Sequence, residues 1–237
     1  MRFCGLALFL AACLMVVAPA PADQYVQTFD VADPMEAGWM YLQGFSSIED
    51  TGGHPGSYLF GENAAYWPLA IGFPLAPGAP FEFSGDFRAR QITSMGVDAI
   101  VEYVCYPTTS GPISLLLFND NGTPADIVDD YAAVLRGADL PSMEDGWLSY
   151  DYDIPVEENT LPAEWTWWEY GTDAPETLEW DYLIQNVSYV GFMFGDPDLF
   201  GISQTWNIGI DNTRISWVPE PGALALLVLG AVCLRRR

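Results

Sequence analysis

Apolar and polar residues alternate with a period of two through the middle of this chain of 237 residues. Glycine, proline, asparagine and aspartate break the alternation at short intervals, which is the pattern of half-buried β-strands joined by turns. The expected strands are Tyr25–Phe29, Trp39–Phe45, Ser57–Phe60, Tyr66–Ile71, Phe81–Ala89, Ala99–Cys105, Ile113–Phe118, Trp147–Ile154, Val187–Phe194 and Trp206–Ser216. So many short strands predict an all-β fold, an antiparallel β-sandwich of two sheets.

The segments between the expected strands add one turn and little helix. Asn119-Asp120-Asn121-Gly122 predicts a hairpin, because Asn-Gly tolerates the positive φ angles of a type I′ turn. Ile127–Arg136 and Thr177–Gln185 are the two stretches with the composition of a short helix, and neither has strong caps at both ends.

The net charge of the chain limits which kinds of molecule it can bind. Residues 23–220 contain all 32 acidic residues but only four arginines and no lysine, a net charge of about −28. Such a surface repels nucleic acid and anionic lipid and attracts divalent cations, which excludes DNA or RNA as a partner. The high hydrophobic and aromatic content excludes a disordered chain.

The N-terminus predicts export. Met1-Arg2 is a short basic region, an apolar run follows to Val17, and Ala20-Pro21-Ala22 supplies the small residues that signal peptidase recognises. We therefore expect a signal peptide over residues 1–22, with cleavage before Asp23. Leu10-Ala11-Ala12-Cys13 fits a lipoprotein box, so acylation of Cys13 stays open as an alternative.

The C-terminus has three parts. Val218-Pro219-Glu220-Pro221-Gly222 ends the last strand, Ala223–Leu234 is apolar, and Arg235-Arg236-Arg237 closes the chain. The apolar run has the composition of a transmembrane helix of about 18 Å, short for a hydrocarbon core of roughly 30 Å. By the positive-inside rule the arginines stay in the cytoplasm, and the upstream chain lies outside. A plain membrane anchor is the alternative reading.

This tail resembles the PEP-CTERM sorting signal of Gram-negative bacteria, with Pro219, Glu220 and Pro221 as the motif. The resemblance implies transient membrane insertion, recognition and cleavage by an exosortase, and transfer to the cell surface or extracellular matrix. The expected domains are then a signal peptide (1–22), an ectodomain (23–217) and a sorting signal (218–237).

Several short segments of the ectodomain resemble the jelly-roll pattern of PEP-CTERM proteins and of some carbohydrate-binding modules. They are Thr28-Phe29-Asp30 with Gly38-Trp39, Gly52–Tyr58, Phe83–Phe87 and Gly209–Ile215. The resemblance implies a jelly-roll-like sandwich and a structural calcium ion near the two ends of the domain. Its ligands would be Asp30 and Asp211, with Asp33 or Glu36 as further ligands. The alternative is that Asp211 and Asn212 are only hydrogen-bonded to a neighbouring loop.

The residues that enzymes commonly use are scarce. No nucleophile elbow, phosphate-binding loop or zinc spacing is present, His54 is the one histidine, and Cys105 is the one cysteine of the ectodomain. The acidic residues form many carboxylate pairs, and no signature selects one pair for glycoside hydrolysis. We therefore predict no enzymatic activity, and we interpret Cys105 as a buried thiol and His54 as a loop residue.

Trp165-Thr166-Trp167-Trp168-Glu169-Tyr170 is the most unusual run of the ectodomain. In a strand Trp165 and Trp167 would face one side and Trp168 and Tyr170 the other, so the rings cannot all enter one core. We expect a long loop or an edge ribbon here. These four aromatic residues are candidates for stacking on a polysaccharide; the alternative is that they fold back as a lid over one end of the sandwich.

Three functions follow, in order of preference. The first is a structural or adhesive role at the cell surface or in the matrix, the second is carbohydrate binding as a lectin-like module, and the third is glycoside hydrolysis. An exposed aromatic platform would favour the second.

Overall fold

The structure is a computed structural model that describes residues 22–65, 68–76, 79–104, 111–123, 129–169, 177–195 and 205–219. Residues Gln24–Trp217 form one compact unit. Several sequence predictions fall outside the described residues, namely those on Cys13, Cys105, Tyr170, Glu220, Pro221, Ala223–Leu234, Arg235–Arg237 and nearly all of the signal peptide. In the part of the chain that is described, no helix has the length and hydropathy to cross a membrane.

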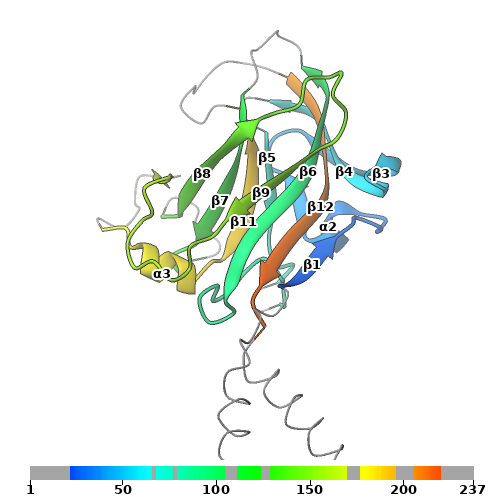
Figure 1. The fold of residues 1–237 in the computed structure, drawn as a ribbon. Coiled ribbons are helices and arrows are strands. Elements are labelled where there is room, and N and C mark those ends of the chain that lie inside the picture. Colours follow the sequence, from blue (N-terminus) through cyan, green and yellow to red (C-terminus); the bar gives the residue numbers. More distant parts are fainter. Residues whose placement is uncertain are drawn as a thin grey trace, which may run out of the picture. The chain divides into compact units, whose positions relative to one another are not determined.

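The compact unit is a sandwich of two sheets (Figure 1). Sheet A has the strand order β3 (Phe45–Gly53), β4 (Gly56–Ala65), β12 (Thr205–Trp217), β6 (Ile92–Val104) and β9 (Leu148–Asp153), and β1 (Asp23–Gln27) also pairs with β12. Sheet B has the order β10 (Trp165–Glu169), β8 (Tyr131–Asp139), β7 (Pro112–Asn119), β11 (Tyr189–Phe194), β5 (Leu69–Gly72) and β2 (Trp39–Tyr41). Neighbouring strands along both orders are antiparallel, so the predicted fold class is confirmed.

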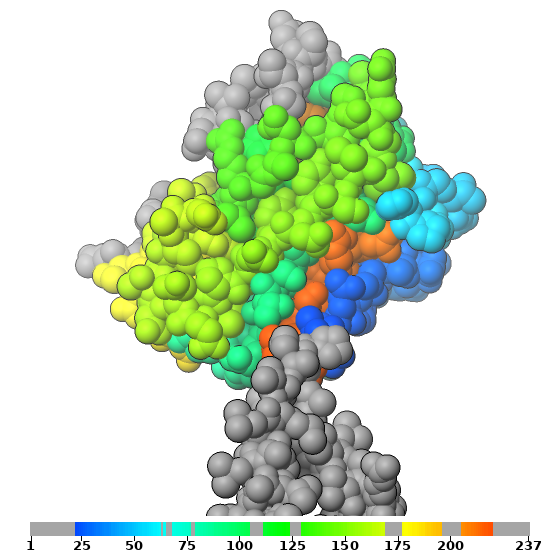
Figure 2. Space-filling model, in the orientation of Figure 1, coloured from blue at the N-terminus to red at the C-terminus, as the bar shows by residue number. Residues whose placement is uncertain are grey.

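The long strand β12 joins most of sheet A. It pairs with β4 near its start and with β6 along nearly its whole length. On the surface, the orange β12 lies between the blue β1 and the teal β6 (Figure 2). The amide of Gln24 donates to the hydroxyl of Ser216 at 3.4 Å, so the two ends of the compact unit lie side by side.

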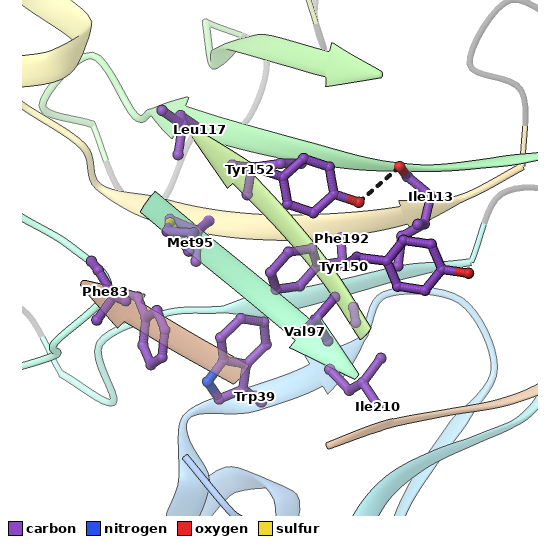
Figure 3. Packing of buried hydrophobic residues seen from close by; sticks show 14 of the residues in the cluster. Trp39, Phe83, Met95, Val97, Ile113, Leu117, Tyr150, Tyr152, Phe192 and Ile210 are labelled. Atoms are coloured by element: carbon purple, nitrogen blue, oxygen red, sulfur yellow. Dashed lines mark hydrogen bonds between the residues drawn. The ribbon is translucent and has the colours of Figure 1, made fainter. Parts of the chain in front are cut away.

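The core fills the space between the sheets. Trp39 of β2 stacks parallel to Phe192 of β11 with ring centroids 6.0 Å apart, and its edge meets Phe83. Tyr152 reaches across from sheet A, where its hydroxyl donates to the carbonyl of Ile113 in sheet B at 2.8 Å (Figure 3). This bond satisfies a buried hydroxyl and joins the two sheets.

Gly137 in β8 makes room for that tyrosine. A Cβ atom at Gly137 would lie 2.4 Å from the carbonyl oxygen of Ile113 and 2.7 Å from the ring of Tyr152. Because one of these neighbours is backbone, no side chain fits at this position without moving β7.

Two predicted elements are wrong. The stretch Ile127–Arg136, expected to form helix, instead enters β8 at Tyr131, because β7 and β10 pair with it on both sides. Phe81–Ala89, expected as a strand, forms turns with one isolated bridge between Gly85 and Val187. Gly85 there has a φ of 100°, and the carboxylate of Asp86 accepts from the amide of Ala89, which favours a turn.

Other local predictions are confirmed in part. The helix expected within Thr177–Gln185 is α3 (Trp180–Gln185), while the short α2 (Pro34–Ala37) and most of β3 have no counterpart among the predictions. Asn121 and Gly122 have the positive φ angles expected of Asn-Gly, 49° and 76°. The connection after them is longer than a two-residue hairpin, since Asn119 pairs with Tyr131.

Candidate functional site

Sheet B is apolar on its outer face as well as on its inner face. Its outward positions form a second hydrophobic cluster, separate from the main core, consisting of Leu69, Leu116, Phe118, Ala132, Val134 and Met193, with Trp168 and Tyr189 packed against it. An antiparallel sheet that only faces water would carry polar side chains on that side. The six residues of the cluster are at most 5% exposed, so this part of the face is already shielded from bulk water within the chain.

A groove of about 710 Å³ opens at one end of this outer face, and we call it the outer groove. Phe118, near the end of β7, and Tyr189, at the start of β11, pair across the sheet and line the groove together with Leu69 and Ile71 of β5. Its remaining described lining consists of Leu42, Phe73, Pro74, Leu75, Ala76, Ala79, Ser84, Gly85, Asp120, Asp130, Val187 and Ser188.

The aromatic residues of the outer groove are held in a fixed arrangement. The rings of Phe118 and Tyr189 stack with centroids 4.4 Å apart at 18°, and Trp168 meets Phe118 edge to face at 6.0 Å. The hydroxyl of Tyr189 donates to a carboxylate oxygen of Asp130, which is buried. Contacts of this kind limit ring rotation, so the ring of Tyr189 is held in one orientation.

Gly191 of β11 lies beneath this arrangement. A Cβ atom there would be 2.7 Å from Cδ1 of Leu69 and 3.4 Å from Cε2 of Phe118. The missing side chain thus lets Leu69 and Phe118 lie close to the sheet, which deepens the outer groove between β5 and β7.

Asp120 and Ser188 form the polar end of the outer groove. The hydroxyl of Ser188 donates to Oδ1 of Asp120 at 2.8 Å, and the same oxygen accepts from the amide of Gly122 at 3.0 Å. The side-chain amide of Asn119 also donates to the carbonyl of Asn186 at 2.6 Å. These bonds hold the turn after β7 against the start of β11, so the carboxylate of Asp120 is held in place.

The predicted aromatic run forms β10, at the edge of sheet B, as the edge-ribbon prediction expected. Trp165 is buried against Trp180 at a centroid distance of 5.0 Å, and Trp167 is partly buried in the main core beside Tyr131. Trp168 faces the opposite side, as alternation predicts, and packs on the outer cluster. Ligand binding by these residues remains a prediction; Trp168 contacts Phe118 of the outer groove but is not part of the groove's described lining.

The structure brings the two predicted calcium ligands to one turn. A Cβ atom added to Gly53 would lie 2.9 Å from Oδ2 of Asp211, and one added to Gly56 would lie 3.4 Å from Oδ1 of Asp30. Asp211 is buried and accepts from the backbone amides of His54 and Asn212 at 2.6 and 2.7 Å. Burial raises the pKa of Asp211 to about 6, against the lowering effect of these hydrogen bonds, and repulsion by Asp98 and Asp30 adds to the rise.

Neither proposed additional ligand of calcium is arranged around Asp211. Asp33 caps α2 by accepting from the amide of Met35 at 2.8 Å, and Glu36 accepts from the amide of Ala32. Among the described residues, no group of three or more histidine, cysteine, aspartate or glutamate side chains is placed to hold a metal ion. The calcium site remains a prediction that rests on Asp30 and Asp211.

His54 has more partners than its interpretation as a loop residue implied. Its Nδ1 lies 3.0 Å from Oδ2 of Asp98, and its ring lies parallel to that of Trp147 at 6.4 Å. Asp98 is a buried hub that also accepts from Ser149, Asn212 and Arg214. Burial raises the pKa of Asp98, but these hydrogen bonds outweigh it and lower the pKa below its usual range. The cluster fastens the β3–β4 turn to sheet A.

The sequence predictions missed Phe118, Tyr189, Asp120 and Asp130. One signal was present: Leu115–Phe118 is continuously apolar rather than alternating, and such a strand is covered on both faces. The sequence did not indicate which distant residues would line the outer groove.

No protein-family model matches this chain, and no curated protein matches its sequence. Among solved structures, the module CtCBM11 is 13% identical with a TM-score of 0.45, covering 85% of this chain and 99% of its own. An exo-β-agarase is 16% identical with a TM-score of 0.43, covering 80% of this chain, which spans only 25% of the agarase chain. A carbohydrate-binding module specific for non-crystalline cellulose is 13% identical with a TM-score of 0.35, covering 80% and 94%. These likenesses are too distant to indicate a ligand for this chain.

Proposed function

We propose that this chain binds a glycan in the outer groove of sheet B and does not cleave it. One observation carries the proposal: a large groove brings stacked aromatic rings of β7 and β11 together with hydrogen-bonded carboxylates that lie just beyond strand ends. Ligand sites in proteins are concave and mostly apolar, with a few fixed polar groups. The outer groove has each of these properties.

The chemistry of a sugar ring fits these groups. A pyranose has an apolar C–H face that packs on an aromatic ring and hydroxyls at its edge that donate to carboxylates. Tyr189 supplies the ring, and Asp120 and Asp130 supply the acceptors. Each carboxylate already holds a neighbouring hydroxyl, Ser188 or Tyr189, which supports a binding role over acid–base catalysis.

We further propose that the protein acts outside the cell. The signal peptide and the tail resembling a PEP-CTERM signal support export by signal peptidase and processing by an exosortase. A glycan-binding sandwich released in this way would attach to polysaccharide at the cell surface or in the matrix. The adhesive role proposed from the sequence and glycan binding are then one function.

A glycan array followed by calorimetric titration of the purified protein tests glycan binding. Replacing Tyr189 by alanine is expected to weaken binding at least tenfold, about 1.4 kcal/mol, because the ring that the sugar contacts is lost. Tyr103→Ala is the matched control: Tyr103 is an exposed tyrosine of β6 in sheet A, outside the groove lining. Absence of any glycan ligand, or equal loss in both variants, would contradict the proposal.

A further inference from the structure

The two ends of the outer groove differ in chemistry. The wall formed by Leu42, the segment Phe73–Ala76 and Ala79 is apolar, and it continues onto Leu69 and Ile71 of β5. Leu42 and Leu75 are 44% and 54% exposed, although both are large aliphatic residues. The amide of Leu42 donates to the carbonyl of Leu69 in β5 at 3.0 Å, and Leu75 follows the end of β5. Both exposed leucines therefore flank β5, a surface suited to an apolar group of a ligand.

The end of the outer groove away from β5 is polar. There Asp120 follows β7, Asp130 precedes β8, and Ser188 and Tyr189 lie at the start of β11. A ligand that fills both ends must therefore carry hydroxyls on one side and methyl groups on the other. An ordinary hexose carries hydroxyls around its whole edge, so some of them would lose water at the leucine wall without gaining a partner, which opposes binding.

Charge restricts the occupant further. The described lining contains two carboxylates and no arginine, lysine or histidine. Arg90 contacts the lining, where it donates to the carbonyl of Ser84 at 2.8 Å, and it also pairs with Glu82 at 3.1 Å. A uronate or sulfated sugar would meet like charges in the groove, whereas an uncharged sugar would not.

We propose that the outer groove selects uncharged polysaccharides whose sugars carry methyl groups, with the methyl group against the apolar wall beside β5 that bears Leu42 and Leu75. This inference rests on the proposed glycan binding and names the class of glycan. The methyl group has two chemical sources, an O-acetyl ester or the C6 methyl of a 6-deoxyhexose. Both place an apolar group at the edge of a sugar that keeps free hydroxyls for Asp120 and Asp130.

Calorimetric titration with matched ligands tests the selection. The first pair is acetylated xylan and the same xylan after mild alkaline deacetylation, and the second pair is a D-rhamnan and a D-mannan of the same linkage and similar length. We expect the methyl-bearing member of at least one pair to bind at least about tenfold tighter, as is typical for one methyl group in an apolar pocket. The pair that shows the preference identifies the source of the methyl group.

Substitutions at the two leucines test whether they cause the preference for methyl-bearing sugars. Leu75→Ser and Leu42→Ser are expected to abolish the preference within a pair while binding of the unmodified polysaccharide is kept. Leu148→Ser is the matched control, because Leu148 is an exposed leucine of sheet A (40%) outside the groove lining. Melting curves confirm that all three variants are folded.

The outcomes separate the two proposals. Equal affinity within both pairs overturns the selection for methyl groups and leaves glycan binding in place. A preference for uronate or sulfated polysaccharide also overturns the selection. If no polysaccharide binds to the folded protein, glycan binding and the selection fall together.

Discussion

Replacing Asp98 by alanine is expected to destabilise the sandwich by about 3–5 kcal/mol, the usual cost of removing one partner of a buried ion pair. Asp98 of β6 accepts from Arg214 at 2.9 Å, and the two side chains are only 6% and 13% exposed. The same carboxylate accepts from Ser149 at 2.6 Å and Asn212 at 2.9 Å. Its removal leaves a buried guanidinium and two further polar groups without this acceptor.

Denaturation by guanidinium chloride, followed by tryptophan fluorescence, measures this cost. For a domain of this size the loss corresponds to a fall in Tm of roughly 6–20 °C. Asp151→Ala is the control, because Asp151 contacts the same arginine at 2.8 Å but its side chain is 66% exposed. Loss of an exposed pair costs at most about 1 kcal/mol. The reasoning fails if the two variants are equally stable.

The stabilisation of the fold by Asp98 should also depend on pH. The pKa of Asp98 is lowered in the folded protein. The contribution of Asp98 to stability is therefore fully present above the pKa of an aspartate in the unfolded chain, about 3.9. The contribution disappears as the pH falls through the folded pKa. The difference between the wild type and Asp98→Ala should therefore shrink below a pH of about 4. A difference that does not change with pH would show that Asp98 is not ionised in the folded state.

Three further predictions concern other parts of the chain. Gly137→Ala should cost about 1–3 kcal/mol by overpacking against Ile113 and Tyr152, and unchanged denaturation midpoints would refute that contact. The raised pKa of Asp211 makes its ionised form destabilising above a pH of about 6, so its contribution should improve as the pH falls from about 6 to 4. Millimolar calcium bound by Asp30 and Asp211 would neutralise this effect and raise the Tm at neutral pH relative to chelator, and an unchanged Tm argues against the ion. Intact-mass analysis of protein from its native host should show a start near Asp23 and loss of Arg235–Arg237, and an uncut C-terminus would refute processing.

The fold class could be predicted from the sequence because the period-two alternation of a strand can be recognised within a few neighbouring residues. It failed at Tyr131–Asp139, where Ala132, Ala133, Leu135 and Arg136 are good helix formers. Pairing with β7 and β10 overrides that local preference. It failed at Phe81–Ala89 for the opposite reason: the aromatic residues recur with a period of two, but Gly85 and Asp86 turn the chain.

The outer groove was beyond prediction from one sequence. Leu42, Leu75, Phe118 and Tyr189 lie on separate segments, and only the strand order of sheet B brings them together. The tryptophan run drew attention because it is unusual in composition. Trp165 and Trp167 are nevertheless part of the core, since alternation along β10 directs them inward and leaves Trp168 on the groove side.

Hydrogen–deuterium exchange with and without the best-binding polysaccharide tests the central claim most directly, because it locates the ligand on the protein. The account predicts slower exchange in Leu69–Gly72, in Phe118–Thr123 and around Ser188 and Tyr189, with no change in β3, β4 and β9 of sheet A. Protection confined to sheet A, for example around Trp147 and Gly52, would contradict it.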